Sequence, residues 1–493
     1  MYRFFEILPG ALVWLTFIAM IVGSAYVPVW VAIFIILFDV YWLLRTTTLS
    51  LYLAFIFRKM HQNMGVDWLS LTKAIPGWDK LYHLVILPMY QEPYELVKET
   101  FDSLIKENYP KDKMIVVLGP EGRAGEDALG VAKRIKAEYG ERFHSFLITQ
   151  HPAGIEGEIP GKGSNQAWMA RQAKEEIIDK QGLDYEKILV SVFDVDAQVY
   201  PEYFGRLTHA FLTTKDNQRA SYQPIPLFNN NIFEAPVFAR VVSLSATFFQ
   251  MMQQARAENL STFSSHSMPF KALVEIGFWH KDVVSEDSRI FWQCYMHYSG
   301  DWRVVPLMYP ISMDANAASG FWQTMRNVYK QQRRWAWGAE NIPYVITNFI
   351  KNKKISLKKK LYWTFHKIDS FYSWATASVV IFALGWLPLI LGGTEFNTTI
   401  LSYNLPQFTR NIMAVAAVGI ALSAALGVVL LPPKPNWFRR RHYLFYLLQW
   451  MLLPVTMILL GSLPAIEAQT RLMLGGKARL GYWVTPKSRD KKL

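Results

Sequence analysis

The chain has 493 residues, of which 51% are hydrophobic and 18% are charged, a balance that excludes an intrinsically disordered protein and a collagen. Its single cysteine, Cys294, excludes a disulfide framework, a four-thiolate zinc site and an iron–sulfur cluster. Lysine and arginine outnumber aspartate and glutamate by 52 to 39, and the net charge of +13 suits a nucleic-acid surface or an anionic membrane face. The positions of the charged residues decide between these two.

Residues 1–67 are expected to form a membrane hairpin followed by an interfacial helix. Residues 7–25 contain no charged side chain, and residues 26–44 contain only Asp39. Each run approaches the roughly 20 apolar residues that cross a bilayer. A cleaved signal peptide is the alternative for the first run, but a second apolar run follows at once. Residues 46–57 are apolar over a shorter length and predict a helix that lies at the membrane interface.

Residues 68–320 have the composition of a soluble domain. Short apolar runs alternate here with stretches of helical length, and this alternation predicts parallel β-α-β units in a doubly wound α/β sheet. In such sheets, ligands bind beyond the carboxyl ends of the strands. The predicted strands are 82–88, 113–118, 143–149 and 187–193, and the predicted helices are 93–107, 125–139 and 164–180.

Residues 321–363 predict interfacial helices, and membrane-like composition returns in residues 364–493. Lysines between 351 and 360 and the arginines 439–441 flank the later apolar runs, whereas residues 394–409 contain no lysine or arginine. This asymmetry places the middle domain in the cytoplasm and explains the positive charge by membrane orientation, so no nucleic-acid partner is expected. The uncharged runs are 370–393, 412–431 and 443–466.

The last apolar run leaves two arrangements open. If residues 443–466 cross the bilayer completely, the basic tail between Lys477 and Lys492 lies outside the cell. Pro454 and Pro464 instead allow a re-entrant or interfacial segment, because proline interrupts helical hydrogen bonding.

Asp194 and Asp196 directly follow the apolar run 188–193. Two carboxylates separated by one residue at a strand end can bind Mg²⁺ or Mn²⁺, which prefer oxygen ligands and often keep substrate phosphates as the remaining ones. An ordinary acidic turn is the alternative. The position favours the metal site, because an open α/β sheet binds its ligand there.

Lys162 lies between two glycines at the beginning of the helix predicted for residues 164–180. The glycines let the backbone approach an anion, and both the lysine and the helix N-terminus attract negative charge. The spacing is not that of a P-loop, so nucleotide hydrolysis is not implied. A simple turn remains the alternative.

Two acids and a basic aromatic segment complete the candidate chemistry. Ser285 is expected to cap a helix over residues 288–298, with Glu286 and Asp287 in the first turn, where Asp287 is a candidate general base. The segment Q-Q-R-R-W at residues 331–335 has two interpretations. It is either a basic interfacial helix or a clamp in which arginine and glutamine hold a diphosphate.

In this order and between membrane segments, these motifs resemble the processive family 2 membrane glycosyltransferases, which include cellulose, chitin and hyaluronan synthases. The resemblance covers about residues 82–337, and the ordered combination is far more specific than any single motif. The matching positions are P-M-Y-Q-E at residues 88–92, Glu121, Lys162, Asp194 and Asp196, Glu286 and Asp287, and Gln331, Arg334 and Trp335.

The resemblance implies a role for each position. It implies that Asp196, with Asp194 nearby, holds the metal on the donor diphosphate, and that Asp287, beside Glu286, deprotonates the acceptor hydroxyl. The donor-binding positions are Tyr90 against the nucleotide base, Glu92, Glu121, Lys162, Asp194, Gln331, Arg334 and Trp335. Residues 264–267 match an acceptor-side segment of the family loosely, and we expect His266 within it to be a structural hydrogen-bonding residue.

The chain departs from the family at residues 119–122, which read G-P-E-G where the family usually has Asp-Asp-Gly and an Asp that pairs with uracil. Glu121 is one methylene longer than Asp and can still accept the base N–H. The membrane portion is small, with about four or five expected spans, so a polymer-conducting channel is not assured. Glucosylceramide-type synthases, which transfer one sugar to a lipid, share the same core motifs.

The sequence therefore predicts an integral enzyme of the plasma membrane whose cytoplasmic domain has the glycosyltransferase A-type fold. We expect a metal-dependent, inverting transfer from a nucleotide sugar, with a UDP-sugar as the first choice, to a growing polysaccharide. Transfer of a single sugar to a lipid acceptor is the alternative. A non-catalytic membrane scaffold or transporter is a more remote one, and its expected feature is unpaired acids within the spans, for which Asp39 is the only candidate. Membrane lipids are expected partners.

Overall fold

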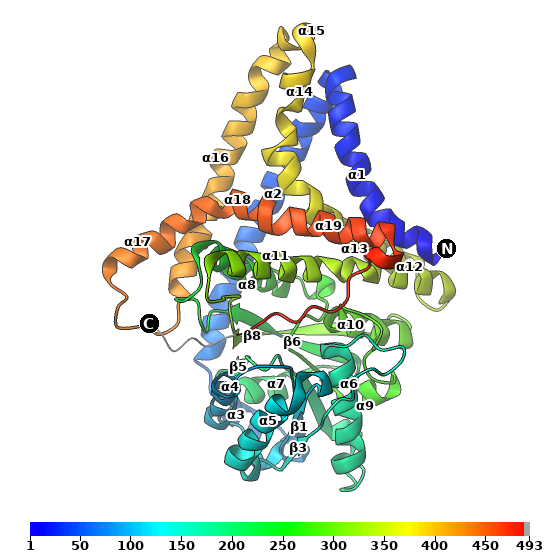
Figure 1. Ribbon diagram of the computed structural model, residues 1–493, viewed down its shortest axis with the longest axis vertical. Coiled ribbons are helices and arrows are strands. Elements are labelled where there is room, and N and C mark those ends of the chain that lie inside the picture. The colour runs from blue at the N-terminus through cyan, green and yellow to red at the C-terminus, as the bar shows by residue number, and fades with distance from the viewer. Residues whose placement is uncertain (488–493) are drawn as a thin grey trace.

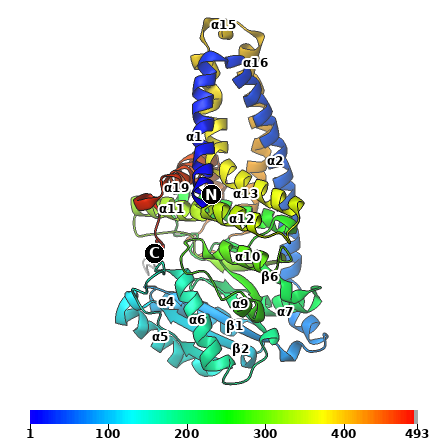
Figure 2. The same cartoon turned by 90° about the vertical axis from the view of Figure 1, so that its right-hand side faces the viewer.

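The computed structural model describes residues 1–487 and places a group of long helices above a domain built on one β-sheet (Figure 1). The first two helices, α1 (Tyr2–Tyr26) and α2 (Pro28–Met64), form the expected helical hairpin: they meet at the turn that joins them and diverge toward the sheet domain (Figure 2). Proline in the first turn of α2 suits its position, because the first helical N–H groups have no partner within the helix.

The prediction of a separate interfacial helix at residues 46–57 is wrong. α2 continues through this segment as one helix of 37 residues. No glycine or proline lies between Val29 and Met64, so nothing in the sequence ends the helix earlier. The charge of Arg45 is neutralised within the protein by Asp369, at 3.1 Å between nitrogen and oxygen.

Four parallel strands and three helices form the first half of the sheet domain. These elements are β1 (Tyr82–Met89), α4 (Tyr94–Lys106), β2 (Met114–Pro120), α5 (Gly125–Tyr139), β3 (Ser145–Ile148), α6 (Lys162–Ala173) and β4 (Ile188–Val192). Alternate side chains of β1 enter two cores: Val85 and Leu87 pack with α4 and α5, whereas Leu84 and Ile86 pack with α6. The elements predicted for this half are confirmed, with ends that shift by a few residues.

The second half of the sheet differs from the predicted parallel, doubly wound arrangement. Its strands are β5 (Gln198–Val199), β6 (Ala220–Phe228), β7 (His266–Pro269) and β8 (Arg303–Met313). β7 pairs antiparallel with both β4 and β6, and β5 pairs antiparallel with β8. The sheet is therefore mixed, with the strand order β3-β2-β1-β4-β7-β6-β8-β5.

Proline explains why the apolar pattern does not reveal these strands. β6 contains Pro224 and Pro226, and β8 contains Pro306 and Pro310, although proline usually confines a strand to a sheet edge. The pairing of β6 with β8 tolerates them through a register shift between Gln223 and Ile225. The mixed half is linked by α7 (Tyr203–Thr213), α8 (Val237–Gln254), α9 (Phe270–Glu275) and α10 (Glu286–His297).

A layer of crosswise helices separates the sheet from the long helices (Figure 1). It contains α11 (Phe321–Ala336), the 3-10 turn η9 (Trp337–Glu340) and α12 (Asn341–Lys351). Above this layer, α13 (Leu357–Phe382) meets α14 (Leu387–Leu391) at a bend of 47°. The short α15 (Gly393–Asn397) then leads into α16 (Ile400–Val429), which lies against α2.

Among residues 1–487, four helices are long and apolar enough to cross a membrane, and the bent pair α13–α14 makes a fifth if it is one span. The four are α1, α2, α16 and the segment Arg440–Leu474. The last segment contains α17 (Arg440–Leu448), α18 (Leu453–Met457) and α19 (Leu463–Leu474). It lies across the base of the long helices and alongside α11 (Figure 1).

The chain leaves α19 through Gly475 and Gly476, whose φ values of +69° and +51° turn it sharply toward the sheet domain. Residues 479–487 then run in extended form beneath α11 (Figure 1). The tail therefore reaches the same side of the long helices as the sheet domain.

Candidate active site

Asp194 and Asp196 lie at the carboxyl end of β4, where a tight turn joins the Ala197 N–H to the Asp194 carbonyl at 2.8 Å. The Asp196 side chain is only 2% exposed, and its Oδ2 accepts a hydrogen bond from the Asp314 backbone N–H at 3.2 Å. The Asn230 amide donates to the Asp196 carbonyl at 3.0 Å. The second acid of the pair is thus held from its backbone and its side chain.

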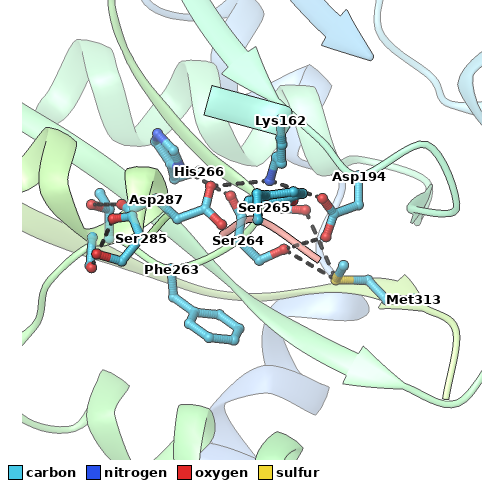
Figure 3. Close-up of polar contacts among 12 residues, drawn as sticks. Lys162, Asp194, Phe263, Ser264, Ser265, His266, Ser285, Asp287 and Met313 are labelled. Carbon is cyan, nitrogen blue, oxygen red and sulfur yellow. Dashed lines mark hydrogen bonds and ion pairs between the residues drawn. The ribbon is translucent and has the colours of Figure 1, made fainter. Parts of the chain in front are cut away.

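Lys162 joins two of the predicted site residues that lie far apart in the sequence (Figure 3). Its Nζ lies 2.9 Å from Asp194 Oδ1 and 3.1 Å from Asp287 Oδ1. Burial opposes the charge of this ammonium, but the carboxylates of Asp194, Asp287 and Glu286 outweigh burial and raise the pKa of Lys162 well above its usual value. One buried cation therefore connects the end of β4 with the beginning of α10.

The carboxylate of Asp194 remains ionised. Burial alone would raise the pKa of Asp194, but the ammonium groups of Lys162 and Lys487 outweigh burial and hold it well below the usual range. The Ser264 hydroxyl adds a hydrogen bond to Asp194 Oδ2 at 2.8 Å (Figure 3).

Glu286 and Asp287 begin α10, but Ser285 does not cap the helix with its side chain as predicted. The Ser285 hydroxyl instead donates to Glu340 Oε1 at 2.7 Å. Glu286 is 1% exposed, and burial together with the neighbouring Asp287 raises its pKa to about 8. The Asp287 side chain keeps 23% of its surface exposed, so the two adjacent acids occupy different environments.

The Q-Q-R-R-W segment belongs to α11, and its residues differ in how close they lie to the site acids. Arg334 Nη1 donates to the Tyr482 hydroxyl at 3.3 Å, and the Arg334 charge acts on Glu286, Asp194 and Asp287. Trp335 instead packs against the rings of Phe228 and Phe263, with centroids 5.9 and 5.7 Å away. Gln331 accepts a hydrogen bond from the Asn316 amide at 3.3 Å.

A second group of predicted residues gathers at the ends of β1 and β2. The Arg123 guanidinium pairs with Glu121 and lies over the Tyr90 ring, with its carbon 4.7 Å from the ring centroid. Glu121 is 5% exposed. Glu92 turns back toward its own chain and accepts from the Tyr90 N–H at 2.6 Å. Burial raises the pKa of Glu92 although Lys487 opposes this shift.

Two tail residues that the sequence analysis did not single out complete the site. Lys487 forms an ion pair with Asp196 Oδ1. The Tyr482 ring lies so close to Gly161 that a Cβ added there would be 2.5 Å from it. The sequence does carry a signal for this segment, because two glycines followed by aromatic residues and a lysine suit a chain that folds back onto a site. In the sequence analysis, its basic residues are related only to the side of the membrane on which the tail lies.

The sequence also singles out His266 and Asp39. His266 is 1% exposed, and its Nδ1 lies 3.0 Å from the Ser264 carbonyl within its own segment, as expected of a structural residue. Burial lowers the pKa of His266. Asp39 accepts a hydrogen bond from the Thr409 hydroxyl at 3.1 Å, so the single acid of the first two apolar runs has a partner on one oxygen.

No family model matches this chain, and no curated protein matches its sequence. Among solved structures, the chain is similar to the mannosyltransferase PcManGT from Pyrobaculum calidifontis in complex with GDP-Man and Mn²⁺. The identity is 15% and the TM-score 0.40, over 83% of this chain and 99% of that one. It is also similar to S. aureus TarS 1-349 in complex with UDP-GlcNAc, at 12% identity and a TM-score of 0.37, over 80% of this chain and 91% of that one.

The predicted residues thus form two groups at one edge of the sheet. The first group surrounds Lys162 and contains Asp194, Glu286, Asp287 and Arg334. The second contains Tyr90, Glu92 and Glu121. Lys487 connects them, because its charge acts on Asp194, Asp196 and Glu92. In the described part of the chain, no cluster of three or more His, Cys, Asp or Glu side chains is placed to hold a metal.

Proposed function

We propose that this protein is a membrane glycosyltransferase that moves a sugar from a nucleotide diphosphate donor to a hydroxyl group of a growing polysaccharide. One observation carries the proposal: Lys162 Nζ contacts the carboxylates of Asp194 and Asp287 at 2.9 and 3.1 Å. The acid of the donor side and the acid of the acceptor side therefore lie on two sides of one ammonium. The motif resemblance assigns the same two acids to these two sides.

On the donor side, we infer that the nucleotide base binds between Tyr90 and Glu121. Tyr90 offers an aromatic face and Glu121 offers an acceptor for a base N–H, while Arg123 orients that carboxylate. The diphosphate would then lie toward two cations of the site, the buried Lys162 and the partly exposed Arg334.

Asp194 and Asp196 fit a divalent cation. Both supply carboxylate oxygens, which Mg²⁺ and Mn²⁺ prefer, and the ion pair of Asp196 with Lys487 shows that its pocket accepts a positive charge. Such an ion would neutralise charge on the departing nucleoside diphosphate. Two carboxylates leave further coordination positions for phosphate oxygens.

On the acceptor side, we infer that Asp287 takes the proton from the attacking hydroxyl. Its carboxylate is partly exposed, whereas Glu286 is buried and burial raises its pKa to about 8, so Asp287 is the more accessible of the two acids and Glu286 is mostly protonated at neutral pH. An acid on the opposite side of Lys162 from the donor carboxylates suits direct displacement with inversion at the anomeric carbon.

We further propose that the sheet domain faces the cytoplasm. The lysines between residues 351 and 360 and the arginines 439–441 lie at the sheet-domain ends of the long helices, while α15 at the far end has no basic residue. The helices α1, α2, α13 and α16 would then cross the membrane, with α19 at its surface.

The proposal is tested by incubating the purified protein in lipid with radiolabelled UDP- and GDP-sugars and with Mg²⁺ or Mn²⁺. We expect one donor to be consumed and its label to appear in a product retained with the acceptor. Sizing of that product separates polysaccharide elongation from transfer of one sugar to a lipid. Absence of consumption with every donor, in protein that retains its fold, would contradict the proposal.

A further inference from the structure

Glu340, at the end of the turn η9, binds the segment that precedes the two acids of α10. Its Oε1 accepts hydrogen bonds from the Val284 N–H at 3.0 Å, the Ser285 N–H at 2.8 Å and the Ser285 hydroxyl at 2.7 Å. Its Oε2 accepts from the indole N–H of Trp337 at 3.0 Å. Four donors therefore converge on one carboxylate, and three of them belong to the two residues before Glu286.

We propose that Glu340 is the positioning residue of the candidate general base Asp287. This inference rests on the proposed function. Ser285 is the N-cap position of α10 but makes no side-chain capping bond, so no side chain of this residue satisfies the first N–H groups of the helix. The Glu340 carboxylate supplies the missing anchor from a neighbouring element. Asp287 follows Ser285 by two residues, so this anchor acts on its position together with two direct contacts: the Lys162 ammonium at its carboxylate and the Thr262 hydroxyl, which donates to its carbonyl at 2.5 Å.

The next residue of the same helical path strengthens the anchor. The Asn341 amide donates to the Ser285 hydroxyl at 3.1 Å and to the Ser288 hydroxyl at 2.9 Å. The Asn341 side chain also accepts a hydrogen bond from α10, because Arg289 Nε donates to Asn341 Oδ1 at 2.5 Å. Residues on both sides of Asp287 are thus held by two adjacent residues at the junction of η9 and α12.

The same helical path also carries the donor-side arginine. Glu340 follows Arg334 by six residues, and α11, η9 and α12 succeed one another without a break. Arg334 acts on the charges of Asp194 and Glu286, while Glu340 holds the segment before Asp287. Glu340 therefore links the donor-binding helix to the segment that carries the candidate base, which must take the proton from the attacking hydroxyl beside the donor. A misplaced base leaves donor binding intact and impairs only the acceptor reaction.

The test uses Glu340→Gln in the full-length protein. The amide has nearly the same size but only one acceptor oxygen and introduces an N–H₂ group, so it cannot serve all four donors. The measured quantity is the ratio of sugar transferred to the acceptor over sugar released by donor hydrolysis. A change in the fraction of folded enzyme cancels in this ratio. We expect the ratio to fall about tenfold, which is less than the roughly 10²–10⁴-fold contribution of the general base itself, with the donor KM unchanged.

Three comparisons complete the experiment. Glu340→Asp keeps the charge but is one methylene shorter, and it should lower the ratio as well. Ser285→Ala removes one of the three bonds and should lower it less. Glu258→Gln, which changes an exposed glutamate that pairs with Arg256, should leave the ratio unchanged.

A double variant separates a positioning role from a purely structural one. If Glu340 acts through Asp287, adding Glu340→Gln to Asp287→Asn lowers transfer no further. If the loss of transfer in the double variant equals the product of the losses in the two single variants, the inference is overturned. An equal fall of transfer and hydrolysis in Glu340→Gln would also overturn it. Failure of the proposed function has a different signature, because the unsubstituted protein would then consume no nucleotide sugar, and the inference would fall with it.

Amide hydrogen exchange gives a readout that does not depend on turnover. Loss of the carboxylate should accelerate exchange at the Val284 and Ser285 N–H groups, which donate to Glu340, and leave exchange in β1 and β4 unchanged. Unchanged exchange at these two amides would also overturn the inference.

Discussion

The ammonium of Lys487 lies against Oδ1 of Asp196, a residue 291 positions earlier in the chain. The tail thus places a cation on the carboxylate that we assign to the metal. Burial would lower the pKa of Lys487, but Asp196, Asp194 and Glu92 outweigh it and raise this pKa, so the side chain stays charged. If Asp196 binds the divalent ion as we propose, we expect the ammonium and that ion to compete for its carboxylate before the donor binds.

This competition predicts that Lys487→Met binds Mn²⁺ more tightly in the absence of donor. A hydrogen bond to a charged group contributes about 1.5–3 kcal/mol, and about 1.4 kcal/mol corresponds to a factor of ten, so we expect roughly a tenfold lower Kd. The Mn²⁺ affinity is measured from the electron paramagnetic resonance signal of the free ion. Lys477→Met, an exposed lysine of the same tail, is the control and should bind Mn²⁺ as the original chain does. An unchanged Kd in Lys487→Met would show that the ammonium and the metal do not share Asp196.

Asp196→Asn should remove most turnover while leaving expression and membrane insertion intact. The amide keeps the size of the buried side chain but loses the negative charge that a divalent cation requires, and we expect a loss greater than about 10²-fold. The measurement is donor consumption at saturating Mg²⁺ or Mn²⁺. Asp179→Asn, on the surface beside Lys174, is the matched control. Activity of the original chain that persists in EDTA would contradict the metal requirement.

Glu121→Ala should weaken recognition of the donor base. The carboxylate is 5% exposed and fixed by Arg123, so its loss leaves both a base N–H and a guanidinium without an acceptor. We expect the donor KM to rise about tenfold and kcat to change less than about twofold, which initial rates over a range of donor concentrations will measure. Arg123→Gln should produce a smaller increase in the same direction. A fall in kcat at constant KM would place Glu121 outside the base site.

Asp287→Asn should retain donor and metal binding and lose transfer by about 10²–10⁴-fold, since the amide is nearly isosteric but cannot accept a proton. Glu286→Gln should be milder, because Glu286 is buried and has a pKa raised to about 8, so the original side chain is already mostly neutral at pH 7. Transfer rates and binding of a non-hydrolysable donor analogue check both variants. An inactive Glu286→Gln beside a nearly normal Asp287→Asn would reverse the two assignments.

The raised pKa of Glu286 also predicts a pH dependence of stability. The Glu286 side chain binds its proton more tightly in the folded protein than in the unfolded chain, where the pKa of glutamate is near 4.5. The stabilisation is complete below that value and is lost as the pH rises toward about 8. Tm, measured from pH 5 to pH 9, should therefore fall less steeply in Glu286→Gln than in the original chain. Parallel Tm curves for the two proteins would show that Glu286 is ionised in the folded state.

The sequence by itself determined the parts of this protein that depend on local pattern. Apolar runs of strand length define β1 to β4, and the acids and glycines directly after these runs lie at the predicted edge of the sheet. These features depend on the length of an apolar run and on which residues come directly after it. Both can be seen in a short stretch of sequence. The long apolar helices follow from length and composition in the same way.

Only the tertiary structure decided the contacts between distant segments. Pairing across the mixed half of the sheet brings the proline-containing strands β6 and β8 into its interior, which no local pattern indicated. Glu340 reaches Ser285 across 55 positions, and Lys487 reaches Asp196 across 291. Each of these side chains is an ordinary charged residue in its own segment. The physical reason is that the role of a carboxylate or an ammonium depends on the groups it contacts. The fold of the whole chain determines which distant groups come into contact.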